Sequence, residues 1–404
     1  MAQMKKVYIL LAVGILLHLV LISTPDTHTF DEFYYVPAAT SVLLGEGELR
    51  PEHPPLVPLI IAGGIAIFGD NPIGWRVFSV IFGALTVLVL YLLVKEVSGD
   101  ERFAFAAAFL MVFQNLFFAF SHLALLDIYL LFFITLSIFL FLKNRFILSA
   151  VALALAATCK LSAAFAVPIF PAFLIYHDLI GAAEGRSLRS IRWGRFALWV
   201  TTLTVCFLAF LYVFDQFYSG LNFQGLWELF SPGVGSSVQA EVVGREIYLD
   251  PFSHLKHMLG HHVGGGWPPT DEPLPWLWFN APYSYYLNGF SLYGVEALEK
   301  YNAAFMGLIF VSLPLAVYRA FWRRDECSFL AVVWFIFTVF IWTPIYLLYP
   351  RPLYFFYILP AIPAICLANA GFFRRTPYLE YYLIIVMFYF MFFQYPIRAI
   401  GQTI

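Results

Sequence analysis

Long apolar runs separated by short polar segments recur along the whole chain. A helix needs about 20 mostly apolar residues to cross the hydrocarbon core of a membrane. About eleven runs reach or approach that length, so we expect an all-α polytopic membrane protein with about eleven transmembrane helices. The runs lie near residues 7–22, 75–94, 103–121, 126–142, 146–159, 161–176, 196–214, 302–318, 327–347, 353–371 and 379–395.

One further apolar run, residues 55–68, is shorter and follows Pro54. If this run does not span the membrane, most Lys and Arg residues fall in loops on one side, which is the cytoplasmic side by the positive-inside rule. If it did span, every later loop would change sides and the bias would reverse. We therefore expect it to lie along the membrane, with the N-terminus in the cytoplasm and the C-terminus outside.

This topology divides the chain into three parts. Residues 1–214 form a membrane module whose first outer loop, residues 23–75, carries juxtamembrane helices. Residues 215–300 form an extracytoplasmic loop rich in Gly, Pro, Trp and Tyr, and residues 301–404 form the C-terminal transmembrane helices.

The composition supports the membrane assignment. Hydrophobic residues make up 61% of the chain and charged residues only 12%, whereas soluble domains carry roughly 25% charged residues. A water-soluble enzyme is therefore excluded. The net charge of −2 shows no basic excess for nucleic acid. The four cysteines lie in apolar runs without a CxxC pair and are expected to be small apolar residues rather than disulfides or metal ligands.

An acidic pair follows the first apolar run, in the order Phe30-Asp31-Glu32-Phe33. Apolar neighbours and a like charge raise the pKa of at least one carboxyl group, which is how a general base is made. The alternative is a solvated acid pair that anchors the end of a helix.

Four single charged residues mark the outer ends of later runs. Asp127 is either a helix cap or a catalytic acid, and each of the three cations either lies among lipid headgroups or binds a phosphate. Together with the acidic pair they provide what an enzyme acting on a lipid phosphate needs: cations that hold the phosphate and a carboxylate that activates a hydroxyl. The three cations are Arg76, Lys160 and Arg351.

Histidines and aromatic residues supply further candidates. His53 precedes two prolines and is either a loop histidine or part of a site. The spacing of His254, His257, His261 and His262 suits a transition metal. However, three glycines follow and no cysteine is near, so we expect polar or headgroup contacts and no cofactor, with a divalent metal as the alternative. Residues 276–286 are rich in Trp and Tyr and form either an interfacial anchor or a wall for a sugar.

The order of these motifs resembles the GT-C membrane glycosyltransferases of the protein O-mannosyltransferase type. Asp31-Glu32 is similar to the acidic pair of that family, and His53-Pro54-Pro55-Leu56 resembles its HPPL segment. Further similarities in the same order are Trp75-Arg76, the Leu-Asp pattern at Asp127, Thr158-Cys159-Lys160, Trp276 to Tyr286, and Arg351 to Tyr357.

The resemblance implies a GT-C fold, with residues 1–214 as the catalytic membrane module, and a polyprenyl-phosphate sugar donor, most simply dolichyl phosphate mannose. It implies a single inverting displacement on the outer face. It also implies site residues in three roles. Asp31 is the base, with Glu32 and Asp127 as further catalytic candidates; Arg76, Lys160 and Arg351 contact the donor phosphate; His53, Trp276, Tyr285 and Tyr357 contact sugar or acceptor.

The acceptor expected from the resemblance is a Ser or Thr hydroxyl of a protein. Eukaryotic members carry a large soluble insert in the long outer loop, for which residues 215–300 are too few. A lipid-linked glycan or a lipid is therefore the alternative acceptor. A transporter is expected to carry its ionisable residues at mid-membrane, and a scaffold does not require charges gathered on one face. The sequence is compatible with a monomer or a dimer.

Overall fold

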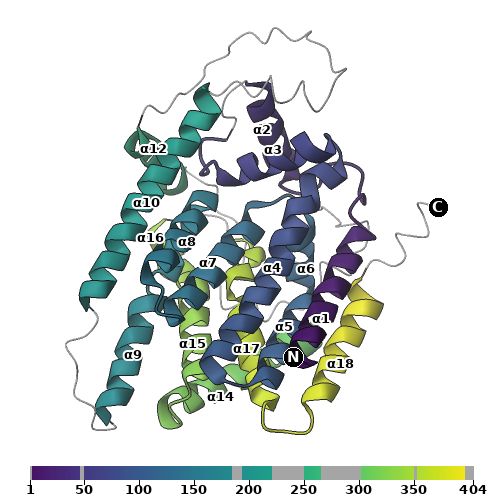
Figure 1. Ribbon diagram of the computed structural model, residues 1–404, viewed down its shortest axis with the longest axis vertical. Helices are drawn as coiled ribbons and strands as arrows, with labels where there is room; N and C mark the ends of the chain where they lie inside the picture. Colours follow the sequence, from purple (N-terminus) through teal and green to yellow (C-terminus); the bar gives the residue numbers. More distant parts are fainter. Residues whose placement is uncertain are drawn as a thin grey trace.

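The computed structural model describes residues 2–45, 50–183, 193–220, 250–264, 302–349 and 353–395. These residues form helices and connecting segments, without a strand (Figure 1). The first half contains α1 (Ala2–Leu19), α2 (Glu32–Leu44), α3 (Leu56–Phe68), α4 (Pro72–Ser98), α5 (Glu101–Val112), α6 (Asn115–His122), α7 (Leu126–Leu142), α8 (Phe146–Cys159), η1 (Leu161–Ala166) and α9 (Ile169–Ala183). The second half contains α10 (Trp193–Gly220), α12 (Pro251–Gly264), α13 (Ala303–Met306), α14 (Ile309–Trp322), α15 (Glu326–Phe335), η5 (Ile336–Phe340), α16 (Trp342–Leu348), η6 (Phe355–Ala361), α17 (Ile362–Phe373), α18 (Leu379–Tyr389) and η7 (Phe390–Gln394).

Each of the predicted apolar runs is mainly helical, and two of them, residues 126–142 and 146–159, coincide with α7 and α8. Six helical segments in the described chain are long and apolar enough to cross a membrane. The bent pair α5 and α6, with 64° between its halves, makes a seventh. The chain is thus an integral multi-pass membrane protein. Because α7, α8 and α18 are shorter, the count of eleven spans stays a prediction.

Local signals in the sequence place several helix ends. Asn71 accepts hydrogen bonds from the backbone N–H groups of Ile73 and Gly74 at 3.0 and 3.3 Å and so caps α4. Gly99, with φ of 65°, ends that helix in the left-handed region that favours glycine. Asp100 then caps α5 by accepting from the N–H of Phe103 at 3.0 Å. Two long helices are thereby joined by a tight turn.

The run at residues 55–68 forms α3, which contains only 13 residues. At 1.5 Å per residue it is about 20 Å long, less than the roughly 30 Å of a hydrocarbon core. It packs against α2 and α4 at one end of the bundle (Figure 1). The two short helices of the first loop therefore occupy the place where the sequence predicts juxtamembrane helices.

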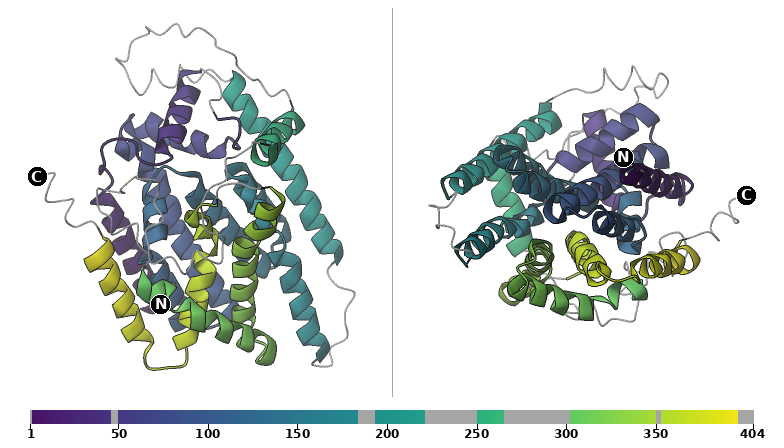
Figure 2. Two further views of the ribbon diagram at one scale, coloured as in Figure 1. Left: turned by 180° about the vertical axis from the view of Figure 1, so that it is seen from behind. Right: turned by 60° about the horizontal axis from the view of Figure 1, so that its bottom comes forward.

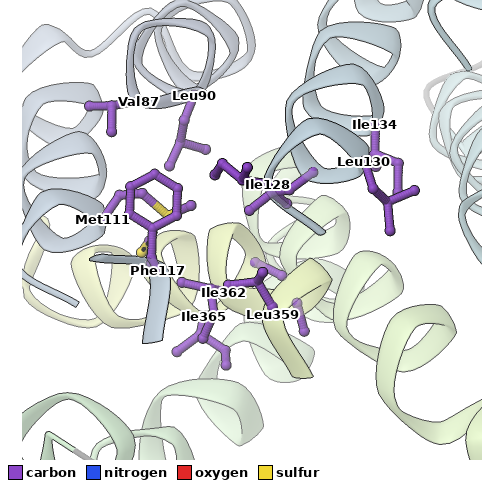
Figure 3. Packing of buried hydrophobic residues seen from close by; sticks show 14 of the residues in the cluster. Val87, Leu90, Met111, Phe117, Ile128, Leu130, Ile134, Leu359, Ile362 and Ile365 are labelled. Carbon is purple, nitrogen blue, oxygen red and sulfur yellow. Dashed lines mark hydrogen bonds between the residues drawn. The ribbon is translucent and has the colours of Figure 1, made fainter. Parts of the chain in front are cut away.

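The core lies where α4, α5, α6, α7 and α17 meet. Figure 3 shows apolar side chains from these helices and from η6 packed between them. Seen from behind, α12 lies against the end of α10 that is nearest to α2 (Figure 2). The end of the bundle with α2, α3 and α12 is the one that carries the site. The labelled core residues are Val87, Leu90, Met111, Phe117, Ile128, Leu130, Ile134, Leu359, Ile362 and Ile365.

Candidate active site

A cavity of about 620 Å³ opens at the α2, α3 and α12 end of the bundle. Its walls come from α2, the segment of residues 50–53, η1, α12, α16 and η6, which lie far apart in the sequence. The size is that of a pocket for a small-molecule ligand. Its charged and imidazole side chains are those of Asp31, Arg50, Glu52, His53, Lys160, His261 and His262.

Asp31 lies in the cavity wall, immediately before the first residue of α2. Burial raises the pKa of its carboxyl group to about 6, and the nearby charge of Asp127 adds to the rise, while Lys160 and Arg50 oppose it. The side chain does not cap α2. A carboxylate with this pKa is largely ionised at neutral pH and is suited to accept a proton.

Glu32, the neighbour of Asp31, points away from the cavity into a buried ion pair with Arg76. Arg76 Nε and Nη2 donate to the two carboxylate oxygens at 2.9 and 2.8 Å, and neither side chain is exposed. The remaining N–H groups of Arg76 donate to backbone carbonyls, so that all five donors are used. The accepting carbonyls are those of Ile22 at 3.1 Å, Pro25 at 2.7 Å and Thr27 at 3.2 Å.

This geometry corrects two expectations. Arg76 does not line the cavity, and its saturated guanidinium has no N–H left for a donor phosphate. Glu32 also accepts from the backbone N–H groups of Thr29 and Ala124 at 3.1 and 2.9 Å, so it has no lone pair free for a substrate hydroxyl. In this structure both residues tie the first loop to α4 and to the turn before α7.

Lys160 and Asp127 form an ion pair beside the cavity. Lys160 Nζ lies 2.8 Å from Asp127 Oδ1, and both side chains are largely buried. Lys160 lines the main cavity, whereas Asp127 lines a small pocket next to it that Lys160 shares. The ammonium group also lies 5.9 and 5.5 Å from the ring centroids of Phe356 and Tyr357. The structure therefore brings Lys160 to the same cavity as Asp31 and places Asp127 behind it.

Two of the predicted sugar or acceptor contacts line the cavity. His53 is half-buried in the cavity wall, and desolvation together with nearby cations holds its pKa well below the ordinary value, which keeps the imidazole neutral. Tyr357 stacks on Trp342 with ring centroids 4.4 Å apart. The other predicted site residues, Trp276, Tyr285 and Arg351, lie outside the described residues.

The structure adds site residues that the sequence did not single out. Arg50 and Glu52 line the cavity and form an ion pair with 3.1 Å between Nη1 and Oε1. The Arg50 guanidinium carbon lies 4.0 Å from the ring centroid of Tyr34. No periodic pattern in the sequence marked these two residues, because residues 50–53 form a turn in which the backbone N–H of His53 donates to the carbonyl oxygen of Arg50 at 3.1 Å.

In the described part of the chain, no three His, Cys, Asp or Glu side chains lie close enough together to hold a metal ion. The histidines at 254 and 262 lie on α12, and each contacts a backbone carbonyl of the 50–53 segment.

Comparison with known proteins relates residues 67–223 to a family described as dolichyl-phosphate-mannose-protein mannosyltransferase. A polyprenol-phosphate-mannose–protein mannosyltransferase from Corynebacterium glutamicum is 35% identical over 121 residues, which are 27% of this chain and 23% of that protein. An undecaprenyl phosphate-α-4-amino-4-deoxy-L-arabinose arabinosyl transferase from Pseudomonas paraeruginosa is 34% identical over 138 residues, 32% of this chain and 25% of that protein. The matched segments thus span about a quarter of these relatives.

The fold is similar over nearly the whole chain to a solved structure, that of the S. cerevisiae protein O-mannosyltransferase Pmt1-Pmt2 complex bound to the sugar donor. The TM-score is 0.75 at 13% identity, and the alignment covers 97% of this chain and 89% of the other. At this identity the likeness concerns the fold, which is the predicted one.

Proposed function

We propose that this protein transfers a sugar from a polyprenyl phosphate to a hydroxyl group. The proposal starts from the GT-C fold and from the match of residues 67–223 to the protein mannosyltransferase family. The observation that carries the proposal is the cavity in which a carboxyl group with a pKa of about 6, Asp31, faces the same space as the ammonium group of Lys160. Mannose is the sugar in the printed name of the Corynebacterium glutamicum relative, a polyprenol-phosphate-mannose–protein mannosyltransferase.

The reaction is a single displacement at the anomeric carbon. Asp31 takes the proton of the acceptor hydroxyl, whose oxygen forms a bond to the anomeric carbon as the bond from that carbon to the phosphate oxygen breaks. Polyprenyl phosphate leaves with the electron pair, and the configuration inverts. A positioned general base contributes about 10²–10⁴-fold to such a rate.

Lys160 stabilises the negative charge that grows on the leaving phosphate. Asp127 keeps the ammonium group in place at 2.8 Å, so we assign it a positioning role. Arg351 stays a predicted second phosphate ligand. His53 and Tyr357, in the cavity wall, offer a neutral imidazole and an aromatic face to the sugar or the acceptor.

The cavity is assigned to the extracytoplasmic face. The basic residues predicted to be cytoplasmic, such as Lys95, Arg102 and Lys143, lie at the far end of α4, at the start of α5 and after α7. α4 begins beside α3 and runs away from the cavity over 27 residues. By the positive-inside rule, this arrangement supports a cavity on the outer face and an N-terminus in the cytoplasm.

The acceptor is proposed to be a protein Ser or Thr hydroxyl, as the names of the mannosyltransferase relatives suggest. The arabinosyl transferase relative keeps open the same chemistry with another sugar and a lipid acceptor.

The test uses the full chain reconstituted into vesicles with labelled dolichyl phosphate mannose and a membrane extract as the source of acceptors. We expect label to be transferred by the wild type and lost by about 10³-fold in Asp31→Asn. The matched control is Asp26→Asn, an exposed carboxylate of the same loop. Label in protein supports the protein acceptor, and label in the lipid fraction supports the alternative. Full activity of Asp31→Asn, or flux of donor without transfer, would contradict the proposal.

A further inference from the structure

We propose that His254 and His262 of α12 are positioning residues, which hold the backbone of residues 50–53 so that Arg50, Glu52 and His53 face the cavity. The proposal rests on the function proposed above and deepens it. It explains a histidine cluster that no metal site accounts for in the described chain.

α12 begins at a well-defined cap. Asp250 accepts hydrogen bonds from the backbone N–H groups of Phe252 and Ser253 at 2.9 Å, and Pro251 occupies the first helical position. From this start, the first histidine falls one turn into the helix and His262 two further turns along. Both point toward the 50–53 segment, and Leu259, His261 and His262 reach the cavity itself.

The histidines contact consecutive carbonyls of that segment. His254 Nε2 lies 2.9 Å from the carbonyl oxygen of Pro51, and His262 Nε2 lies 3.1 Å from that of Glu52. His254 is fully buried, and its Nδ1 lies 2.9 Å from Oδ1 of Asp215 at the outer end of α10. One side chain thus links α10, α12 and the first outer loop, over 203 residues of sequence.

The chemistry of the partners assigns the donors. A carbonyl oxygen can only accept, so Nε2 of His254 and of His262 carry the hydrogen. An ionised Asp215 carboxylate can also only accept, so Nδ1 of His254 carries a hydrogen as well, and the ring donates from both nitrogens. The Nε2–H of His254 therefore has a fixed direction toward Pro51.

The 50–53 segment needs such tethers because of its sequence. Pro51 has no backbone N–H, and the N–H of His53 already donates within the segment, to the carbonyl oxygen of Arg50 at 3.1 Å, so few donors are left with which the segment could anchor itself. The carbonyl groups of the segment remain as hydrogen-bond acceptors, and two of them contact histidines of α12. Holding these carbonyls fixes the direction of the neighbouring side chains at 50, 52 and 53, all of which line the cavity.

The first experiment separates the two nitrogens of His254. A glutamine amide can occupy the place of Nε2 and an asparagine amide that of Nδ1. We expect His254→Gln to keep turnover within about twofold, because it can still donate to Pro51. We expect His254→Asn to lower kcat/KM by about 3- to 10-fold, the effect of one lost hydrogen bond. His262→Gln and His262→Asn should behave in the same way, and Lys256→Gln, exposed on the same helix, is the control.

The reverse order would overturn the proposal. If His254→Asn is active and His254→Gln is not, the histidine serves only to join α12 to Asp215. Equal losses of kcat/KM in His254→Gln and His254→Asn would also contradict the proposal, because the losses would then reflect poorer packing of the side chain and not the hydrogen bond to Pro51.

A second measurement does not depend on turnover. In a Cys206→Ser background, Glu52→Cys reports the position of the segment through its rate of reaction with a membrane-impermeant maleimide. We expect His254→Asn to change this rate at least threefold and His254→Gln to leave it unchanged. An equal rate in all three proteins would refute the tether, whereas a changed rate without any transferase activity would retain the tether and reject the proposed function.

Discussion

Asp31 and Glu32 are adjacent in the chain, yet they occupy opposite environments. Asp31 faces the cavity, and among the described residues no hydrogen bond to its carboxylate is found. Glu32 is fully buried and accepts four hydrogen bonds, two of them from Arg76. The N-terminus of α2 thus lies between the cavity, which Asp31 lines, and the buried ion pair of Glu32 and Arg76.

The difference shows how one acidic pair serves two purposes. A carboxylate whose lone pairs are all occupied cannot take a proton from a substrate, but it can fix the loop on which it lies. A carboxylate that is buried without partners keeps a raised pKa and stays available. Glu32 holds the loop in place, and the residue before it is thereby presented to the cavity.

The largest expected effect that tests this comparison is on stability. Glu32→Gln leaves Arg76 as an uncompensated buried cation, and breaking a buried pair in this way costs about 3–5 kcal/mol of the free energy of unfolding. We expect thermal unfolding in detergent to shift strongly downward, while Asp31→Asn and Asp26→Asn unfold like the wild type. A Glu32→Gln protein that has normal stability but lacks activity would show that Glu32 is a catalytic residue and not a structural one.

A smaller effect is expected at the cation of the cavity. Lys160→Met removes the proposed charge-assisted contact with the leaving phosphate, and a contact of this kind is worth about 1.5–3 kcal/mol. We expect kcat/KM for the donor to fall by about 10- to 100-fold. Lys160→Arg, which keeps the charge, should retain more activity than Lys160→Met. Equal kcat/KM in the wild type and Lys160→Met would exclude Lys160 from phosphate binding.

The smallest effect concerns pH. Asp31, the proposed base, can accept a proton only when it is ionised, and burial raises its pKa to about 6. Activity should therefore be level above pH 6 and fall about tenfold for each pH unit below it. Because Lys160 opposes the rise in this pKa, Lys160→Met should move the midpoint to higher pH. If Lys160→Met and the wild type have the same midpoint, the pH profile does not report the ionisation of Asp31.

Much of the architecture could be predicted from the sequence because hydrophobic length and charge bias are local properties. The helices at 126–142 and 146–159 were predicted to the residue, and the short run at 55–68 was correctly set apart from the long ones. The motifs also predicted that Asp31, His53, Lys160 and Tyr357 share a site, and the structure brings all four to one cavity.

The wrong expectations concern partners rather than positions. Arg76 is correctly predicted at the start of a long helix, but its partner Glu32 is 44 residues away. Glu52, which the sequence did not single out, has its backbone carbonyl 3.1 Å from Nε2 of His262, a residue 210 positions away. A sequence shows that a charge exists at a given place, but not which charge will face it.

The sequence by itself determined that this protein is a helical membrane protein, and it determined the order in which its charged residues appear, because burial of apolar side chains in lipid depends on composition and run length alone. The tertiary structure decided which carboxylate of the acidic pair is free and which is saturated. It also decided that Arg76 is structural and that α12 closes one wall of the cavity. The physical reason is that hydrogen bonds and ion pairs act over a few ångströms, so their partners are chosen only when distant segments meet.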